Sequence, residues 1–195
     1  MPCHSIARKE RHFVKTTNCK RTAYATFAKE KKTKHNPKMT EINIVIDYGE
    51  TLGRIYTETG YTSQARSNIG LNPELSDTMA ATEDDSRILR GFFTSGLNEA
   101  GTFITRYMMP CTTTIVTNSK TKEIEEGIID TTVPENYPPQ SIITLEREIK
   151  EFITNYITHR WMMTIKPDEA EIQAARLQNS TNRIREILAT RKKPL

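Results

Sequence analysis

The sequence predicts an α+β fold that is mainly helical, with about four helices and a β-hairpin between helices two and three. Apolar residues recur at helical spacing in four segments, which predicts the helices. β-Branched residues gather in a stretch near residues 111–133, which predicts the hairpin. The 195 residues fit one domain with an appendage and are enough to bury a substantial core.

The first expected helix spans residues 44–66. Val45, Tyr48 and Leu52 begin a series of apolar and aromatic residues at spacings of three and four, so they would share one helical face. Glycines within this segment weaken it, because each costs ~1 kcal/mol relative to alanine inside a helix. Residues 67–81 are expected to form a loop.

The second expected helix carries the widest apolar face. Thr82 is a suitable N-cap, and the acidic residues 83–85 that follow suit the positive end of the helix dipole. Apolar side chains then recur from Ile88 to Met108, which predicts that this helix forms the core. Pro110 is expected to end it.

The hairpin is followed by two more helices. Asn118-Ser119 is a turn signal between two β-like runs, and residues 134–139 form a proline-rich loop. The third helix covers about residues 142–163, and Pro167 begins the fourth. A narrow heptad-like seam on the fourth helix predicts close packing against the third. The seam consists of Ala170, Ala174, Leu177, Thr181, Ile184 and Leu188.

Charge divides the chain into two parts. Residues 1–38 hold 11 Lys+Arg and 2 Asp+Glu, whereas residues 39–195 hold 17 and 22. Because residues 1–38 are so charged and poor in aliphatic side chains, we expect a basic, disordered or loosely helical extension. We expect residues 39–195 to form a single helical domain. Met39-Thr-Glu-Ile is also a suitable translation start, so two hypotheses remain: the extension is part of the protein, or its start is mis-assigned.

Several classes of protein are disfavoured. No apolar run approaches the ~20 residues needed to span a bilayer, and no secretory signal is visible. We therefore expect that the protein does not associate with a membrane and that it is located in the cytoplasm of a host cell or in a virion. The three cysteines are too few and too scattered for a disulfide scaffold. We also expect no cofactor and no metal, because the Cys and His spacings in residues 1–38 do not match a zinc site. These residues are Cys3, His4, His12, Cys19 and His35.

No catalytic group is identified. Cys111 follows a predicted helix C-terminus, which does not favour a thiolate. His159 would be a lone histidine on a helix, where packing or surface roles are more common. The acidic residues 83–85 are explained by helix capping, since a cation site needs oxygens from other parts of the chain. We therefore expect a protein that is not an enzyme.

The helix that begins at Thr82-Glu-Asp-Asp and continues to Gly101 resembles the acid-capped helix of small tailed-phage neck proteins, the head–tail connector or head-completion group. The run Ile157-Thr-His-Arg-Trp-Met-Met-Thr-Ile-Lys-Pro-Asp-Glu-Ala-Glu, with the terminal Arg191-Lys-Lys-Pro, is similar to proteins of prophage structural modules. The resemblance covers about residues 44–195. It implies homo-oligomeric rings, contacts with virion proteins such as a portal, a lumen that passes DNA, and no catalytic residues.

The first functional hypothesis is a non-enzymatic virion assembly protein that acts by oligomerisation. Its candidate contacts are exposed apolar residues of the hairpin and the loop after it, namely Ile115, Ile124, Ile128 and Tyr137. The alternative is a nucleic-acid-binding accessory protein, because clustered basic side chains bind phosphates without sequence preference. Its candidate residues are Lys29, Lys31, Lys32, Lys34, Lys38, Arg191, Lys192 and Lys193.

Overall fold

The computed structural model describes residues 39–68, 78–108 and 110–190, and the structural statements below concern this part of the chain. It contains four long helices, one short 3-10 helix and a three-stranded antiparallel sheet. In chain order the elements are β1 (Met39–Asp47), α1 (Tyr48–Asn68), η1 (Glu83–Asp85), α3 (Ser86–Thr105), β2 (Cys111–Thr117), β3 (Ile124–Pro134), α4 (Pro139–Ile165) and α5 (Pro167–Ala189).

The sheet has the order β1-β3-β2, so β3 is the central strand. Val45 of β1 lies opposite Ile128 of β3, and Ile128 lies opposite Thr114 of β2. A register irregularity between Val116 and Thr117 precedes the turn that joins β2 to β3. Opposed residues in antiparallel strands share a face, so this register assigns each side chain to one side of the sheet.

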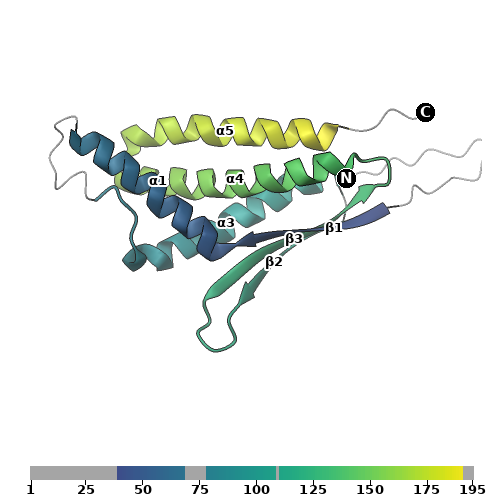
Figure 1. The fold of residues 1–195 in the computed structure, drawn as a ribbon, viewed down its shortest axis with the longest axis horizontal. Coiled ribbons are helices and arrows are strands. Elements are labelled where there is room, and N and C mark those ends of the chain that lie inside the picture. Colours follow the sequence, from purple (N-terminus) through teal and green to yellow (C-terminus); the bar gives the residue numbers. More distant parts are fainter. Residues whose placement is uncertain (1–38, 69–77, 109, 191–195) are drawn as a thin grey trace, which may run out of the picture. The chain divides into compact units, whose positions relative to one another are not determined.

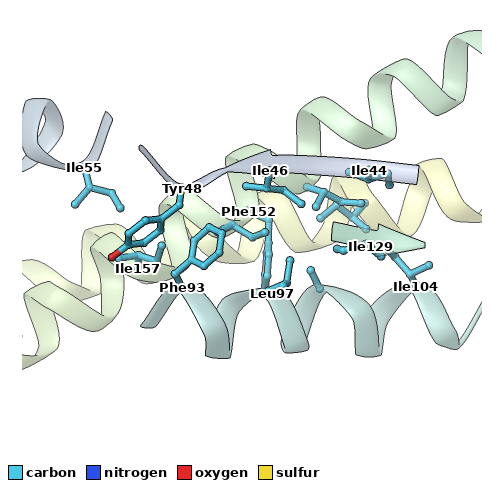
Figure 2. Packing of buried hydrophobic residues seen from close by; sticks show 14 of the residues in the cluster. Ile44, Ile46, Tyr48, Ile55, Phe93, Leu97, Ile104, Ile129, Phe152 and Ile157 are labelled. Atoms are coloured by element: carbon cyan, nitrogen blue, oxygen red, sulfur yellow. The ribbon is translucent and has the colours of Figure 1, made fainter. Parts of the chain in front are cut away.

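The helices α3, α4 and α5 lie on one side of the sheet (Figure 1). Side chains of β1 and β3 on this side meet the apolar face of α3, and Ile44, Ile129, Phe93 and Leu97 are fully buried there. Figure 2 shows these side chains between the strands and α3. We call this the inner face of the sheet.

Two glycines allow the close approach of α3 to the inner face. A Cβ on Gly127 of β3 would lie 3.0 Å from side-chain atoms of both Leu97 and Phe93. A Cβ on Gly101 of α3 would lie 2.6 Å from Thr113 Cγ2 of β2. The backbones therefore come together at a distance that a larger side chain would prevent.

The α4 helix is the centre of the helical part, and α5 returns along it (Figure 1). Only Lys166 separates the two helices, and Pro167 takes an N-terminal position of α5, where its missing N–H costs nothing. Within the predicted seam, Ala170, Thr181, Ile184 and Leu188 are buried, whereas Ala174 and Leu177 are half-buried. The prediction that the fourth helix packs on the third is confirmed.

The start of the first helix was predicted wrongly. Residues 39–47 form the strand β1, and α1 begins at Tyr48. The reason is visible in the alternation of Ile42, Ile44 and Ile46, whose side chains point to one face of the sheet while the residues between them point to the other. Residues 44–47 fit both the helical period and the strand period, and pairing with β3 makes them part of a strand.

The predicted hairpin is part of a larger sheet. Its strands β2 and β3 follow α3 and precede α4 in the chain. They are not a separate two-stranded unit, because β1 pairs along β3 from Met39 opposite Pro134 to Asp47 opposite Glu126. The α3 helix also ends at Thr105, before the proline that was expected to end it.

The predicted basic extension 1–38 and the basic tail 191–195 lie outside the described residues. The expected loop 67–81 is described only in part, since α1 continues to Asn68 and the description resumes at Thr78. Among the described helices, none is both long and apolar enough to cross a membrane.

Candidate functional site

The side of the sheet that faces away from the helices is the candidate functional site. We call it the open sheet face. None of the helices in the described part of the chain lies on this side (Figure 1). The alternation of buried and exposed positions, together with the register, assigns to it Met39, Glu41, Asn43, Val45 and Asp47 of β1, Thr112, Thr114 and Val116 of β2, and Glu126, Ile128, Asp130, Thr132 and Pro134 of β3.

The middle of the open sheet face is apolar. Val45 is 36% exposed, and the half-buried Ile128 and Val116 lie on the neighbouring strands. Met39, at the end of β1 on the same face, is 43% exposed. A sheet that faces water usually carries polar side chains on its outer side, so grouped apolar side chains here indicate an interaction surface.

Carboxylates surround this apolar middle. Glu41, Glu126 and Asp130 belong to the open sheet face, which carries no Lys or Arg. The Asn43 side-chain amide donates a hydrogen bond to Asp130 Oδ1 at 2.7 Å, which fixes the position of that carboxylate. A concavity of about 410 Å³ is lined by Glu41, Asn43, Thr112 and Asp130, together with neighbouring residues. The surface therefore suits a partner that carries both cationic and apolar groups.

The sheet also has two edges. Among the described residues, β1 and β2 each pair with β3 on one side only, so their outer backbone groups meet no further strand. Unpaired strand edges are sites at which another chain can add. The edges border the open sheet face, so one partner could contact both.

The four predicted contact residues do not form one surface. Ile128 lies on the open sheet face, as expected for a contact residue. Ile115 is half-buried and packs against the core, and Ile124 is 8% exposed. Tyr137 is buried at 4% exposure, and its hydroxyl donates a hydrogen bond to the Ile187 carbonyl at 2.8 Å. The expectation that Ile124 and Tyr137 are exposed was wrong, because α5 and the core cover these apolar side chains.

Sequence reasoning missed most of the open sheet face. Val45 was assigned to a helix, so its proximity to Ile128 and Thr114 was not foreseen. Glu41 and Asn43 lie before the predicted helix and received no role. The signal that could have found them is the period of two in residues 41–46, which places every second residue on the same face of a strand.

A second hollow of about 500 Å³ lies where α1, η1 and the hairpin meet. Tyr48, Tyr56 and Arg90 line it, and the Tyr48 hydroxyl donates to the Ser86 carbonyl at 3.4 Å. Burial is the main cause that raises the pKa of both tyrosines, so their phenols remain protonated at neutral pH. Neither tyrosine is thereby prepared to act as a base or nucleophile.

Charged side chains link α1, α4 and α5. Arg54 of α1 pairs with Glu151 of α4 at 2.8 Å, and the buried Glu148 of α4 lies 3.6 Å from Arg183 of α5. Burial, followed by repulsion from Glu151, raises the pKa of Glu58 in the same region. The Arg54–Glu151 pair and the Arg183 side chain are exposed, and ion pairs at the surface contribute little to stability. We interpret this cluster as structural.

The two candidate reactive residues have unreactive surroundings. Cys111 is the first residue of β2, and burial raises the pKa of its thiol. His159 of α4 is half-buried, and burial together with Arg160 lowers its pKa, so it is neutral at pH 7. Of the acidic residues before α3, Asp85 belongs to the capping box of η1, since its Oδ2 accepts hydrogen bonds from the Thr82 N–H and hydroxyl at 2.9 Å.

A search of the described residues finds no group of three or more Cys, His, Asp or Glu side chains that could hold a metal ion. The eight basic residues predicted for nucleic-acid binding all lie outside the described ranges, so their placement does not enter the site. Comparisons of the chain with protein families, with curated proteins and with solved structures give no match.

Proposed function

We propose that this protein is a non-enzymatic assembly protein that associates with further copies of itself through the open sheet face. The observation that carries the proposal is the apolar middle of that face, formed by Val45, Val116 and Ile128. The edges of β1 and β2 border it, and they pair with no further strand in the described part of the chain. Burial of this surface in a contact would remove apolar area from water, which is the main favourable term in most protein association.

The resemblance to tailed-phage neck proteins supports the same kind of function. It implies oligomeric rings in which a hairpin or loops contact neighbours, and the β2–β3 hairpin is the element that carries one edge of the open sheet face. A virion setting with a portal-like partner is the biological context that we propose on the basis of this resemblance.

A single substitution tests the proposal. Ile128→Lys places a charge in the middle of the open sheet face, where desolvation of the ammonium would oppose burial in a contact. We expect the sedimentation coefficient of the wild-type full chain to rise with protein concentration, and that of the Ile128→Lys chain to stay at the monomer value.

The matched control is Ile172→Lys on α5, because Ile172 is 52% exposed but lies away from the sheet. This variant should associate like the wild type. A wild-type chain that remains monomeric at every concentration, or an Ile128→Lys chain that associates normally, would contradict the proposal.

A further inference from the structure

We propose that the open sheet face of one copy binds the basic segment 1–38 of a second copy. This inference rests on the proposed function, because it names the part of the second copy that makes the contact. It is carried by the charges of the described face and by the distribution of charge along the sequence.

The open sheet face is unsuited to bind a second open sheet face. Glu41, Glu126 and Asp130 surround its apolar middle without a compensating Lys or Arg on the same face. With Asp47, each face carries four carboxylates, so two such faces in contact would bring eight together, and like charges across an interface oppose association. The complement of this face must therefore be a positively charged part of the second copy.

Residues 1–38 are the part of the chain that has this charge. They hold 11 Lys+Arg and only 2 Asp+Glu, whereas residues 39–195 hold 17 and 22. Their apolar residues stand close to basic ones, as in Phe13-Val14-Lys15 and in Phe27, which precedes Lys29 by two positions. The segment thus combines the two kinds of group that an apolar surface surrounded by carboxylates would bind.

Residues 1–38 are also long enough to reach a second copy, and they join the folded part next to the open sheet face. The segment joins β1 at Met39, which itself belongs to the open sheet face. Thirty-eight extended residues reach at most about 130 Å, whereas a strand of nine residues such as β1 is only about 30 Å long. A neighbouring copy can therefore be reached without rearrangement of the folded part.

Charge reversal in the full chain tests the contact. The first variant, E41K/E126K/D130K, makes the open sheet face basic. The second, K29E/K31E/K32E/K34E, makes residues 29–34 acidic and removes most of the positive charge of the segment. Each variant alone should associate at least about tenfold more weakly than the wild type, because like charges then oppose each other. An equimolar mixture should restore association, since each variant's segment matches the other's face, and native mass spectrometry should show complexes that contain both chains.

Two controls accompany the test. E99K/E171K/E186K makes the same change of charge at exposed positions on α3 and α5, and it should associate like the wild type. E41Q/E126Q/D130N removes three of the four negative charges of the face without adding positive ones, so it replaces the lysine variant if that variant does not fold. It should also weaken association, and thermal unfolding followed by circular dichroism reports whether each variant is folded.

The outcomes separate this inference from the proposed function. If the wild type associates but neither reversal weakens association, or if the mixture does not restore it, the inference is wrong and the proposed function stands. If the wild type is monomeric at every concentration, both are wrong.

Discussion

The two faces of the β1-β3-β2 sheet have opposite chemistry on the same strands. The neighbouring residues Ile128 and Ile129 illustrate this, because Ile129 is fully buried against the helices whereas Ile128 lies on the open sheet face. The inner face requires glycine where α3 approaches closely. The open sheet face carries four carboxylates around apolar side chains. Packing explains the residues of the inner face, whereas the grouping on the open sheet face is the basis of the association that we propose.

The largest expected effect is a difference in stability between substitutions on the inner face and on the open sheet face. Ile129→Ala should lower the free energy of unfolding by about 2–5 kcal/mol, because it removes a fully buried side chain and leaves a cavity. Ile128→Ala should lower it by less than about 1 kcal/mol, since its side chain is only half-buried. Urea unfolding of both variants measures the difference, and equal losses would show that the open sheet face is part of the core.

The next effect concerns the close approach of α3 to the sheet. Gly101→Ala should lower the free energy of unfolding by about 1–3 kcal/mol, because its Cβ would lie 2.6 Å from Thr113 Cγ2. Gly53→Ala on α1 is the control, since a Cβ at this position would have no neighbouring atom within 4 Å. Because alanine favours a helix more than glycine does, this change should raise stability by up to about 1 kcal/mol. A neutral Gly101→Ala would mean that α3 does not contact β2 this closely.

A smaller effect is expected where the loop after β3 meets α5. Tyr137→Phe removes the hydroxyl that donates to the Ile187 carbonyl, so stability should fall by about 1 kcal/mol. In the wild type, burial raises the pKa of Tyr137 to about 12, and alkaline difference absorbance should show one tyrosine that titrates later than the others. If Tyr137 titrates normally, its side chain is exposed and the packing described here is wrong.

The smallest expected effect concerns Glu58, which lies beside the packed helices and not on the sheet. Burial raises its pKa, so the folded chain binds this proton more tightly than the unfolded chain does. This group therefore favours folding at low pH, and its contribution is lost as the pH rises through the folded pKa. Glu58→Gln should make stability less dependent on pH in that range. An unchanged pH profile of unfolding would contradict the assignment.

Sequence reasoning predicted the helical part of the fold better than the sheet. The α3, α4 and α5 helices have long apolar faces and clear proline or acidic N-termini, so local signals agree with tertiary packing. The β1 strand was missed because residues 44–47 satisfy both the helical and the strand period. Pairing with β3, whose paired residues lie at least 79 positions further along the chain, decides between them, and no local pattern encodes that partner.

The candidate site was less predictable for the same reason. Ile128 was identified, but the side chains beside it come from β1 and β2 and are brought together only by the register of the sheet. Ile124 and Tyr137 looked like surface residues because apolar residues near a turn carry no sign of what covers them. The local sequence pattern does not show which side chains are buried by elements that are distant in the sequence.

The central claim is that copies of this protein associate through the open sheet face. Methyl NMR spectra of the full chain, recorded over a dilution series, test it most directly. The claim predicts that the methyl signals of Val45, Val116 and Ile128 shift or broaden as concentration rises, while those of Ile129 and Ile172 do not. Concentration-dependent changes confined to Ile172 and the surface of α5, or no changes at all, would contradict it.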